Sequence, residues 1–196
     1  MSFYSIAPFI KKHYPEYYSI ESYPKAECVT IHKIDQEWGI FSNFARTPLV
    51  IDGVRFKNAE QLFQLMKFTD HEVIHEVYQA ANPKMTAKKW EKTHRRTDWG
   101  NILVDAIKRC LTIKYEQCEE FRVALDRSRG HFIVEDQTTF PKKTPDTWGV
   151  KLEEDHYTGP NLLGRLLMEL RDTGHLDHSL PQDALACVEV LRNLKQ

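Results

Sequence analysis

The segment of residues 58–68 constrains the fold most, because it combines helical periodicity with two opposite charges beside an apolar stripe. In a helix, Glu60, Gln64 and Lys67 share one stripe, since 3.6 residues per turn bring positions i, i+4 and i+7 into line. Seven residues rise by about 10.5 Å, so Glu60 and Lys67 cannot pair directly and each needs water or another partner. The adjoining apolar stripe contains Ala59, Leu62, Phe63 and Met66.

This segment has two interpretations. Spacing alone favours an amphipathic helix whose polar edge is solvated, because that is the commoner arrangement. A carboxylate and an ammonium beside an apolar stripe are also what a polar cleft in a protein core requires. The other motifs of the chain shift the balance toward the cleft.

The composition is that of a globular protein, with 41% hydrophobic and 28% charged residues. A chain of 196 residues fits one domain with a full core, and it contains no repeat or flexible linker. The formal net charge of -1 argues against a protein whose whole surface binds nucleic acid, although it leaves room for a local basic patch.

We expect neither a membrane span nor a secretory signal in this sequence. It has no apolar run long enough to span a bilayer, and residues 1–18 lack the apolar stretch of a secretory signal. Four scattered cysteines form no C-x-x-C pair, which is typical of a reduced compartment: Cys28, Cys110, Cys118 and Cys187. We therefore expect an intracellular, cytoplasmic protein without a membrane partner.

The periodicity predicts an α+β fold, a single helix-rich domain over residues 1–196 with a small antiparallel β-sheet. Asp52 and Gly53 tolerate positive φ angles, so residues 49–56 are predicted to form a hairpin. Asn161 is a good N-cap for a helix with five inward leucines that ends at Gly174. Further strands are expected at 27–33 and 131–135, a loop at 141–145, and helices at 70–81, 84–93, 98–114, 116–127 and 182–194.

Residues 71–75 match the H-E-x-x-H motif, in which two histidines one turn apart hold zinc. A third ligand is needed, and the continuation typical of metzincins is missing. Glu91 is a possible distant ligand, but it lies in a heavily basic stretch. Asp70 is a suitable N-cap, which would put His71 in an exposed first turn. We therefore favour a surface helix and expect no metal, while a zinc peptidase is the weaker alternative.

A basic stripe follows, in which Glu91 is the only acid within residues 84–96. Lys84, Lys88 and Lys92 recur every four residues and would line one helical face, which is a candidate for phosphate or nucleic-acid contacts, or a solvated basic face. The stripe contains Lys84, Lys88, Lys89, Lys92, Arg95 and Arg96. Trp99 comes next, and it is a candidate core residue or a surface on which a base stacks.

A second acidic group comes later in the chain. Glu135 ends a predicted strand, and Asp146 precedes Trp148 and Gly149 in a predicted loop. Two carboxylates beside a tryptophan suit acid/base chemistry on a flat ring. Asn161 is expected to cap its helix, although the amides at that N-terminus are an alternative anion site.

Taken in order, these segments resemble the NADAR family, named for its association with NAD and ADP-ribose. The resemblance covers about residues 37–172 of the chain. It rests on the sequences at 41–44, 52–53, 58–68, Trp99, Glu135, 146–149 and 159–169. The segment from Glu135 to Asp146 is longer than the family pattern leads us to expect, so Asp146 is the firmer of the two acids.

The resemblance implies an N-glycosidase that cleaves a ribose–amine bond and needs no cofactor. Family members act on phosphorylated riboflavin-pathway intermediates or on guanine bases that carry ADP-ribose. Some are antitoxins beside ADP-ribosyltransferase toxins that modify DNA. The basic stripe favours ADP-ribosylated guanine in nucleic acid as the substrate, and it allows such a toxin as a partner. A riboflavin-pathway ribosylaminopyrimidine is the alternative substrate, and a non-catalytic ADP-ribose-binding module is the alternative function.

By motif position, Glu60 and Asp146 are the expected catalytic carboxylates, and Lys67 is a nucleophile or an electrostatic partner. A carboxylate would stabilise an oxocarbenium-like state and activate water. Alternatively, the lysine amine would form a Schiff base, which requires a lowered pKa of Lys67. Residues expected to bind substrate are Phe41, Ser42, Asn43, Gln64, Trp99, Trp148, Gly149 and Asn161.

Overall fold

The computed structural model describes residues 6–193 and has the expected α+β architecture. The chain forms two compact units, each assembled from two chain segments. The first comprises Met1–Ser42 with Glu119–Leu176, and the second comprises Asn43–Cys118 with Asp177–Gln196. The expectation of a single domain stays a prediction.

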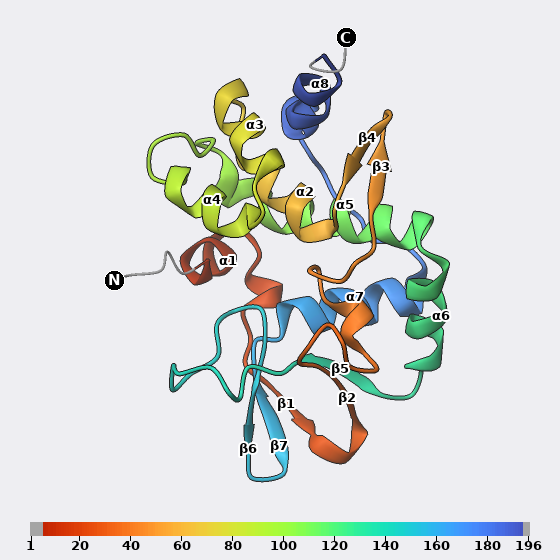
Figure 1. Cartoon of the computed structure of the whole chain (residues 1–196). Helices are drawn as coiled ribbons and strands as arrows, with labels where there is room; N and C mark the ends of the chain where they lie inside the picture. Colours follow the sequence, from red (N-terminus) through yellow and green to blue (C-terminus); the bar gives the residue numbers. More distant parts are fainter. Residues whose placement is uncertain (1–5, 194–196) are drawn as a thin grey trace. The chain divides into compact units, whose positions relative to one another are not determined.

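The first unit contains most of the strands (Figure 1). The strand β7 (His156–Gly159) pairs antiparallel with both β1 (Glu21–Pro24) and β6 (Lys151–Glu153). The strand β2 (Cys28–Ile31) runs parallel to β5 (Phe132–Glu135), a pairing that the sequence patterns did not indicate. The core of the first unit includes Tyr23, Val134, Val150 and Tyr157.

One helix of the first unit packs on this strand framework, and a second helix packs on the first. The helix α7 (Leu162–Thr173) contacts β5, and α6 (Glu119–Arg127) contacts α7. The predicted inward face of α7 is confirmed, because Leu162, Leu163, Leu166, Leu167 and Leu170 are all buried. Gly174 ends the helix as predicted, with a φ of 77° that favours glycine. The helix α1 (Ala7–His13) was not foreseen.

Gly164 lets α7 approach β5 closely. A Cβ atom at this position would lie 2.0 Å from the carbonyl oxygen of Ile133, a distance that no side chain tolerates. The leucine face of the helix therefore packs directly on the strand that precedes the 136–145 loop.

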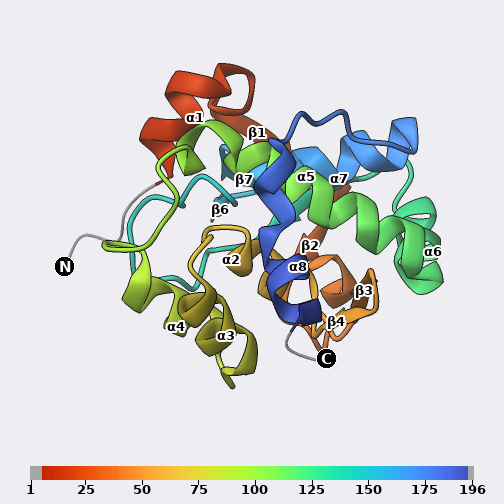
Figure 2. The same cartoon turned by 90° about the horizontal axis from the view of Figure 1, so that it is seen from above.

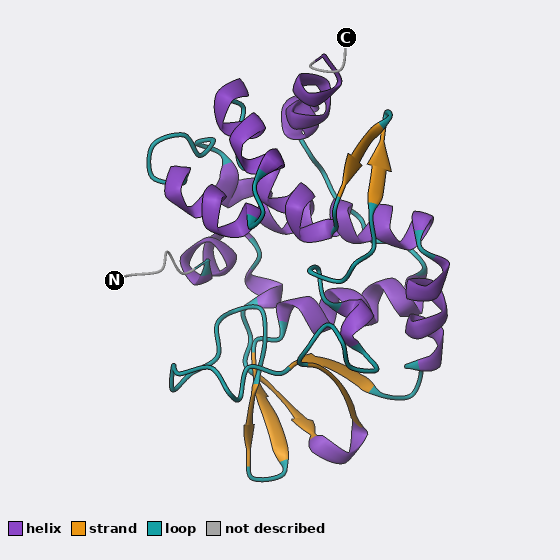
Figure 3. Ribbon diagram, in the orientation of Figure 1, coloured by secondary structure: helices purple, strands orange, loops and turns teal. Residues whose placement is uncertain are grey.

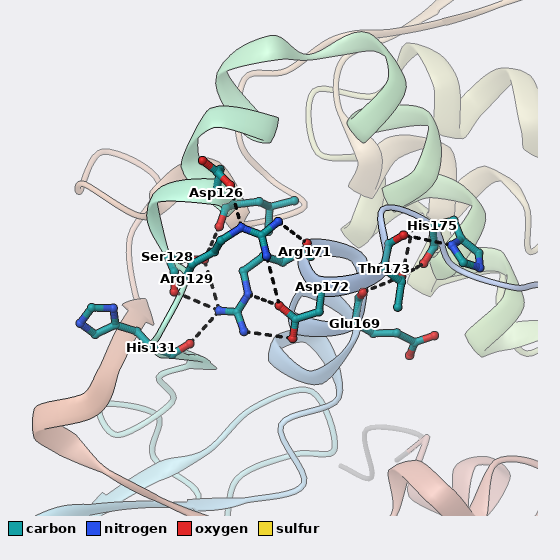
Figure 4. Close-up of polar contacts among 10 residues, drawn as sticks. Asp126, Ser128, Arg129, His131, Glu169, Arg171, Asp172, Thr173 and His175 are labelled. Carbon is teal, nitrogen blue, oxygen red and sulfur yellow. Dashed lines mark hydrogen bonds and ion pairs between the residues drawn. The ribbon is translucent and has the colours of Figure 1, made fainter.

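Two arginines tie the C-terminal ends of α6 and α7 together (Figure 4). Arg171 Nη1 donates hydrogen bonds to the carbonyl oxygens of Ser128, at 3.0 Å, and His131, at 2.7 Å. Arg129 Nη2 donates to the carbonyl oxygen of Arg171 at 3.0 Å. Each guanidinium also has its own carboxylate: Arg171 Nε donates to Asp172 Oδ1 and Arg129 Nε donates to Asp126 Oδ1, both at 2.7 Å, so the charges of this network are balanced locally.

The second unit combines the predicted hairpin with helices (Figure 3). The strands β3 (Leu49–Ile51) and β4 (Val54–Phe56) pair antiparallel, and the turn residues Asp52 and Gly53 have φ angles of 47° and 78°. The helices are α2 (Ala59–Leu65), α3 (His71–Gln79), α4 (Pro83–Trp90), α5 (Trp99–Gln117) and α8 (Ala186–Asn193). Each overlaps its predicted range.

The last helix closes the second unit. Figure 2 shows α8 beside α3, and α8 also contacts β4. Cys187 is buried on α8 and Cys110 on α5, and the four cysteines are free thiols. Within residues 6–193, no helix combines the length and apolar character needed to cross a membrane.

Lys114 lies fully buried on α5, and burial lowers its pKa from 10.5 to about 7. Between these two values the unfolded chain holds a proton that the native state lacks, so this group makes the native state more stable as pH rises. Below pH 7 the native state carries the full cost of the buried ammonium.

We predict that Lys114→Met stabilises the protein most at pH 6 and progressively less as the pH approaches 10. The measurement is the difference in unfolding free energy between variant and wild type, obtained by urea denaturation at each pH. The exposed residue Lys92 provides the control, since Lys92→Met removes the same charge from the surface and should change the unfolding free energy little. A pH-independent difference for Lys114→Met would contradict the prediction.

Candidate active site

The start of α2 is fixed by two asparagines. Asn58 caps the helix, with its Oδ1 accepting from the amide of Gln61 at 2.9 Å. The side-chain amide of Asn58 donates to the carbonyl oxygen of Phe44 at 3.2 Å. The carbonyl oxygen of Asn43 accepts from the amide of Glu60 at 2.9 Å. These bonds hold the 43–44 segment against the first helical turn.

The polar stripe of α2 is buried. Glu60 is 8% exposed and Gln64 is 3% exposed, which overturns the simpler reading of a solvated helix edge. Gln64 Nε2 donates a hydrogen bond to Glu60 Oε1 at 2.7 Å, and this orients the carboxylate. Glu60 also lies in the first turn, where the positive end of the helix favours a carboxylate.

Lys67 lies just beyond the helix. The sequence predicted a continuous stripe, but α2 ends at Leu65, and Lys67 is held in the following turn. Its amide donates to the carbonyl oxygen of Gln64 at 3.4 Å, and its carbonyl oxygen accepts from the amide of Arg96 at 2.9 Å. The backbone therefore fixes the position of Lys67 from both sides.

Glu91 is the ion-pair partner of Lys67. Lys67 Nζ lies 2.5 Å from Glu91 Oε1, and the two side chains are 10% and 17% exposed. Desolvation by burial lowers the pKa of Lys67 below its ordinary value, although the charges of Glu91 and Glu60 oppose this effect. The expectation that Glu60 and Lys67 find separate partners is confirmed.

Aromatic rings cover the other side of the Lys67 ammonium. Its Nζ lies 5.7 Å from the ring centroid of Phe63 and 5.8 Å from that of Trp99, within cation–π range. The two rings pack against each other with centroids 5.2 Å apart. Trp99 is only 3% exposed, so it is a core residue in this structure, and a stacking role on a base stays a prediction.

Lys84 is the member of the basic stripe that reaches this cluster. Its Nζ lies 4.0 Å from Glu60 Oε1 and 5.0 Å from the ring centroid of Phe44. Its side chain is 58% exposed, so the ammonium faces solvent at the edge of the buried charges. Glu60, Glu91, Lys67 and Lys84 thus make a balanced set of two acids and two amines.

The remaining basic residues differ in environment. Lys88 and Lys92 are exposed and Arg95 is half-buried, and their contact with phosphates stays a prediction. Arg96 requires a correction, because its guanidinium is 6% exposed and bonds to Asp98 at 2.6 Å and Asp183 at 2.8 Å. These two carboxylates already pair with the positive charge of the Arg96 guanidinium, so that charge is not available to a phosphate.

Asp146, Trp148, Gly149 and Asn161 belong to the first unit. Asp146 Oδ1 accepts from Gln137 Nε2 at 2.6 Å and from the amide of Trp148 at 2.9 Å. The amide of Asp146 donates to Gln137 Oε1 at 2.9 Å. Asp146 is exposed, and no described residue bonds to its Oδ2 atom.

The first amides of α7 are already used. Leu162 and Leu163 donate to the carbonyl oxygens of Thr147 and Trp148, each at 3.1 Å, and Asn161 donates to Gly149 at 3.2 Å. The alternative that these amides receive an anion is therefore wrong. Gly149 is needed here, because a Cβ atom would lie 2.4 Å from the carbonyl oxygen of Glu135.

Asn161 requires a correction. It occupies the N-cap position with a φ of 52°, but its side chain makes no capping bond. Its Oδ1 instead accepts from the amide of Glu135 at 3.1 Å, and its Nδ2 donates to the carbonyl oxygen of Ile133 at 2.9 Å. These two bonds hold β5 in place. Because Asn161 is also fully buried, its side-chain amide is not free to bind a substrate.

Phe41 and Ser42 lie at the end of the first segment of this unit. Phe41 is fully buried, and its ring stacks on Trp38 at 5.6 Å and meets Phe121 edge-on at 6.1 Å. Ser42 is half-buried, and its amide donates to the carbonyl oxygen of Gly39 at 3.1 Å. The structure gives Phe41 a packing role, and substrate contact by either residue stays a prediction.

The H-E-x-x-H segment forms the surface helix α3, as expected. Asp70 caps it by accepting from the amide of Val73 at 3.0 Å, and His71 and Glu72 are exposed. His75 bonds to Gln79 at 3.0 Å. Within residues 6–193, no three His, Cys, Asp or Glu side chains gather closely enough to suggest a metal site.

The sequence patterns do not identify two polar residues that hold the predicted amine and one of the predicted acids. The sequence pattern indicates Glu91 only as a possible distant zinc ligand, and its isolation among basic residues is the one sign of a special role. Gln137 carried no signal, because its bonds to Asp146 depend on how the 136–145 loop folds back.

Known proteins with similar sequences belong to the family that the motifs indicate. The family model for the NADAR domain matches residues 30–173. The N-glycosidase YbiA of Escherichia coli is 29% identical over 146 residues, which cover 74% of this chain and 86% of that protein. An N-glycosidase of Nostoc punctiforme is 25% identical over 149 residues, covering 74% and 90%. The NMR structure of E. coli YbiA has a TM-score of 0.60 at 27% identity, covering 78% of this chain and 91% of that one.

We predict that Glu91→Gln lowers the pKa of Lys67 further, because the carboxylate of Glu91 raises it in the wild type. The measurement is a pH titration of the Lys67 side chain by NMR, with the signal assigned through Lys67→Arg. Glu76→Gln is the matched control, since Glu76 pairs with Lys89 on the surface. An unchanged or higher pKa in Glu91→Gln would contradict the prediction.

Proposed function

The chain belongs to the NADAR family and is a hydrolase of N-glycosyl bonds, and we propose that it removes ADP-ribose from guanine bases of nucleic acid. The observation that supports this proposal best is the buried cluster of Glu60, Gln64, Lys67 and Glu91. A carboxylate and an amine held in a poorly solvated place suit a sugar carbon that becomes cationic as its bond to nitrogen stretches.

Glu60 is the carboxylate that faces the anomeric carbon. Its Oε1 is held by Gln64, and no described residue hydrogen-bonds to its Oε2. In the direct route, the negative charge stabilises the oxocarbenium-like state while a carboxylate activates the attacking water. The exocyclic nitrogen keeps the electrons of the broken bond and gains one proton of the attacking water, and the remaining hydroxyl of that water bonds to the anomeric carbon of ADP-ribose.

Lys67 supports a second route. The substrate ring opens to an imine at the anomeric carbon, and the neutral lysine amine attacks that carbon. The exocyclic nitrogen leaves with a proton, and water then hydrolyses the lysine imine to release the sugar. Glu91, at 2.5 Å, accepts the proton that the Lys67 ammonium must lose first. The lowered pKa of Lys67 favours this route.

Asp146 remains the proposed second carboxylate, carried over by motif position. Its Oδ1 is held by Gln137 and by the Trp148 amide, which orients the side chain. We assign it the activation of water in the direct route. Trp148, which is half-buried, is the better of the two tryptophans for contact with a base.

Nucleic acid is favoured over a small metabolite because α4 carries exposed amines next to the cluster. Lys84 lies at the edge of the buried charges, and Lys88 follows it by one helical turn. Lysines in such a row neutralise successive phosphates. An ADP-ribosyltransferase toxin that modifies DNA would be the source of such a substrate and is a proposed partner.

We predict that the protein releases ADP-ribose from guanine-modified DNA faster than it cleaves a ribosylaminopyrimidine phosphate. Product release is followed by chromatography with equal concentrations of each substrate. Glu60→Gln, Lys67→Met and Asp146→Asn should each slow hydrolysis by about 100-fold or more, as loss of an acid/base or nucleophilic group does.

Two exposed residues serve as matched controls for these substitutions. Glu72→Gln and Lys12→Met remove the same charges from the surfaces of α3 and α1, and both variants should keep wild-type rates. Faster cleavage of the pyrimidine phosphate would contradict the proposed guanine substrate and identify the ribosylaminopyrimidine as the preferred one. Tight binding of modified DNA without any turnover would identify a non-catalytic module instead.

A further inference from the structure

Two residues that hydrogen-bond to Glu60 each carry a buried side-chain oxygen without a hydrogen-bond partner. Gln64 Oε1 and Asn43 Oδ1 are each shielded from solvent, on residues that are 3% and 8% exposed. Within residues 6–193 no donor reaches either atom. Buried acceptors are almost always satisfied in folded proteins, so two unpaired oxygens on residues that bond to Glu60 indicate a missing donor.

Both orphaned residues are fixed by contacts with Glu60. The carbonyl oxygen of Asn43 accepts from the Glu60 amide at 2.9 Å, and Gln64 Nε2 donates to Glu60 Oε1 at 2.7 Å. A carboxylate oxygen can only accept, so the side-chain amide of Gln64 must present its nitrogen to Glu60. Its oxygen is therefore left as a fixed acceptor.

The ligand group that satisfies these oxygens must be a donor. A phosphate offers only acceptors near neutral pH, so it cannot fill this role. A ribose offers hydroxyl donors at its 2 and 3 positions, and the 2-hydroxyl is on the carbon next to the anomeric carbon. Because Glu60 faces the anomeric carbon in the proposed function, the hydroxyl at the 2 position is the nearest donor to these oxygens.

We propose that Gln64 and Asn43 accept hydrogen bonds from the hydroxyls of the ribose whose bond is cleaved, which makes the site selective for ribosyl over 2-deoxyribosyl groups. This inference rests on the proposed function. A site built to bond a hydroxyl rejects the analogue without it, because the buried acceptors are then left unpaired.

Such selectivity matters for a guanine in DNA. An ADP-ribosylated guanine carries two N-glycosyl bonds, one to the added ribose and one to the deoxyribose of the strand. Cleavage of the second bond would leave an abasic position. Acceptors that require a 2-hydroxyl direct hydrolysis to the added sugar and protect the strand.

The test is calorimetric binding of ADP-ribose and of its analogue that lacks the 2-hydroxyl of the terminal ribose, with the full chain. We expect the wild type to bind the analogue at least about 30-fold more weakly. Gln64→Met and Asn43→Leu should bring this ratio close to one, mainly by weakening the binding of ADP-ribose. Asn43→Asp retains an acceptor and should keep most of the selectivity.

Gln79→Met is the matched control, because Gln79 is an exposed amide on α3 that bonds only to His75 among the described residues. It should leave the ratio unchanged. Thermal unfolding of each variant checks that the fold is intact, and Asn43→Asp provides a second variant if Asn43→Leu is unstable.

Equal binding of the two sugars by the wild type would overturn the inference, as would failure to bind either one. Equal weakening of both sugars by the variants would also overturn it, because the residues would then be merely structural. Selective binding together with no release of ADP-ribose from modified DNA would instead contradict the proposed function and leave standing only the selectivity of the site for a ribosyl group.

Discussion

The ion pair between Lys67 and Glu91 sets the charge arrangement around α2. An isolated ammonium would be costly to bury, and a carboxylate at 2.5 Å offsets much of that cost. Burial still lowers the pKa of Lys67, so the amine holds its proton less tightly than a lysine in water. Glu60 can then act beside this pair as a separately oriented carboxylate, because Gln64 rather than Lys67 bonds to it.

In the first unit, a side chain that the sequence assigns to substrate binding instead bonds to the protein backbone. Asn161 looked like a capping or substrate-binding residue, but its side chain joins α7 to β5. Gly164 permits the same close approach, and the amides of α7 bond to the 147–149 segment. These contacts fix the backbone beside Asp146, so the motif around residues 146–161 encodes the position of the loop as much as any chemistry.

Local sequence patterns predict the elements that neighbouring residues determine. They do not predict the contacts between residues far apart in the sequence. The Asp52-Gly53 turn, the Asp70 cap and the leucine face of α7 follow from neighbouring residues, so the sequence pattern was sufficient for each. The parallel pairing of β2 with β5 joins residues about a hundred positions apart and leaves no local pattern. Glu91 likewise reaches Lys67 across 24 positions, which spacing rules for a single helix do not cover.

The central claim is that N-glycosyl cleavage takes place at Glu60 and Lys67, and a crystal structure of the Glu60→Gln variant with ADP-ribosylated guanosine tests it most directly. We expect the anomeric carbon to lie within roughly 4 Å of residue 60 and of Lys67 Nζ, close to the separation of reacting atoms. A sugar bound to other residues, with both of these side chains out of reach of the anomeric carbon, would contradict the claim.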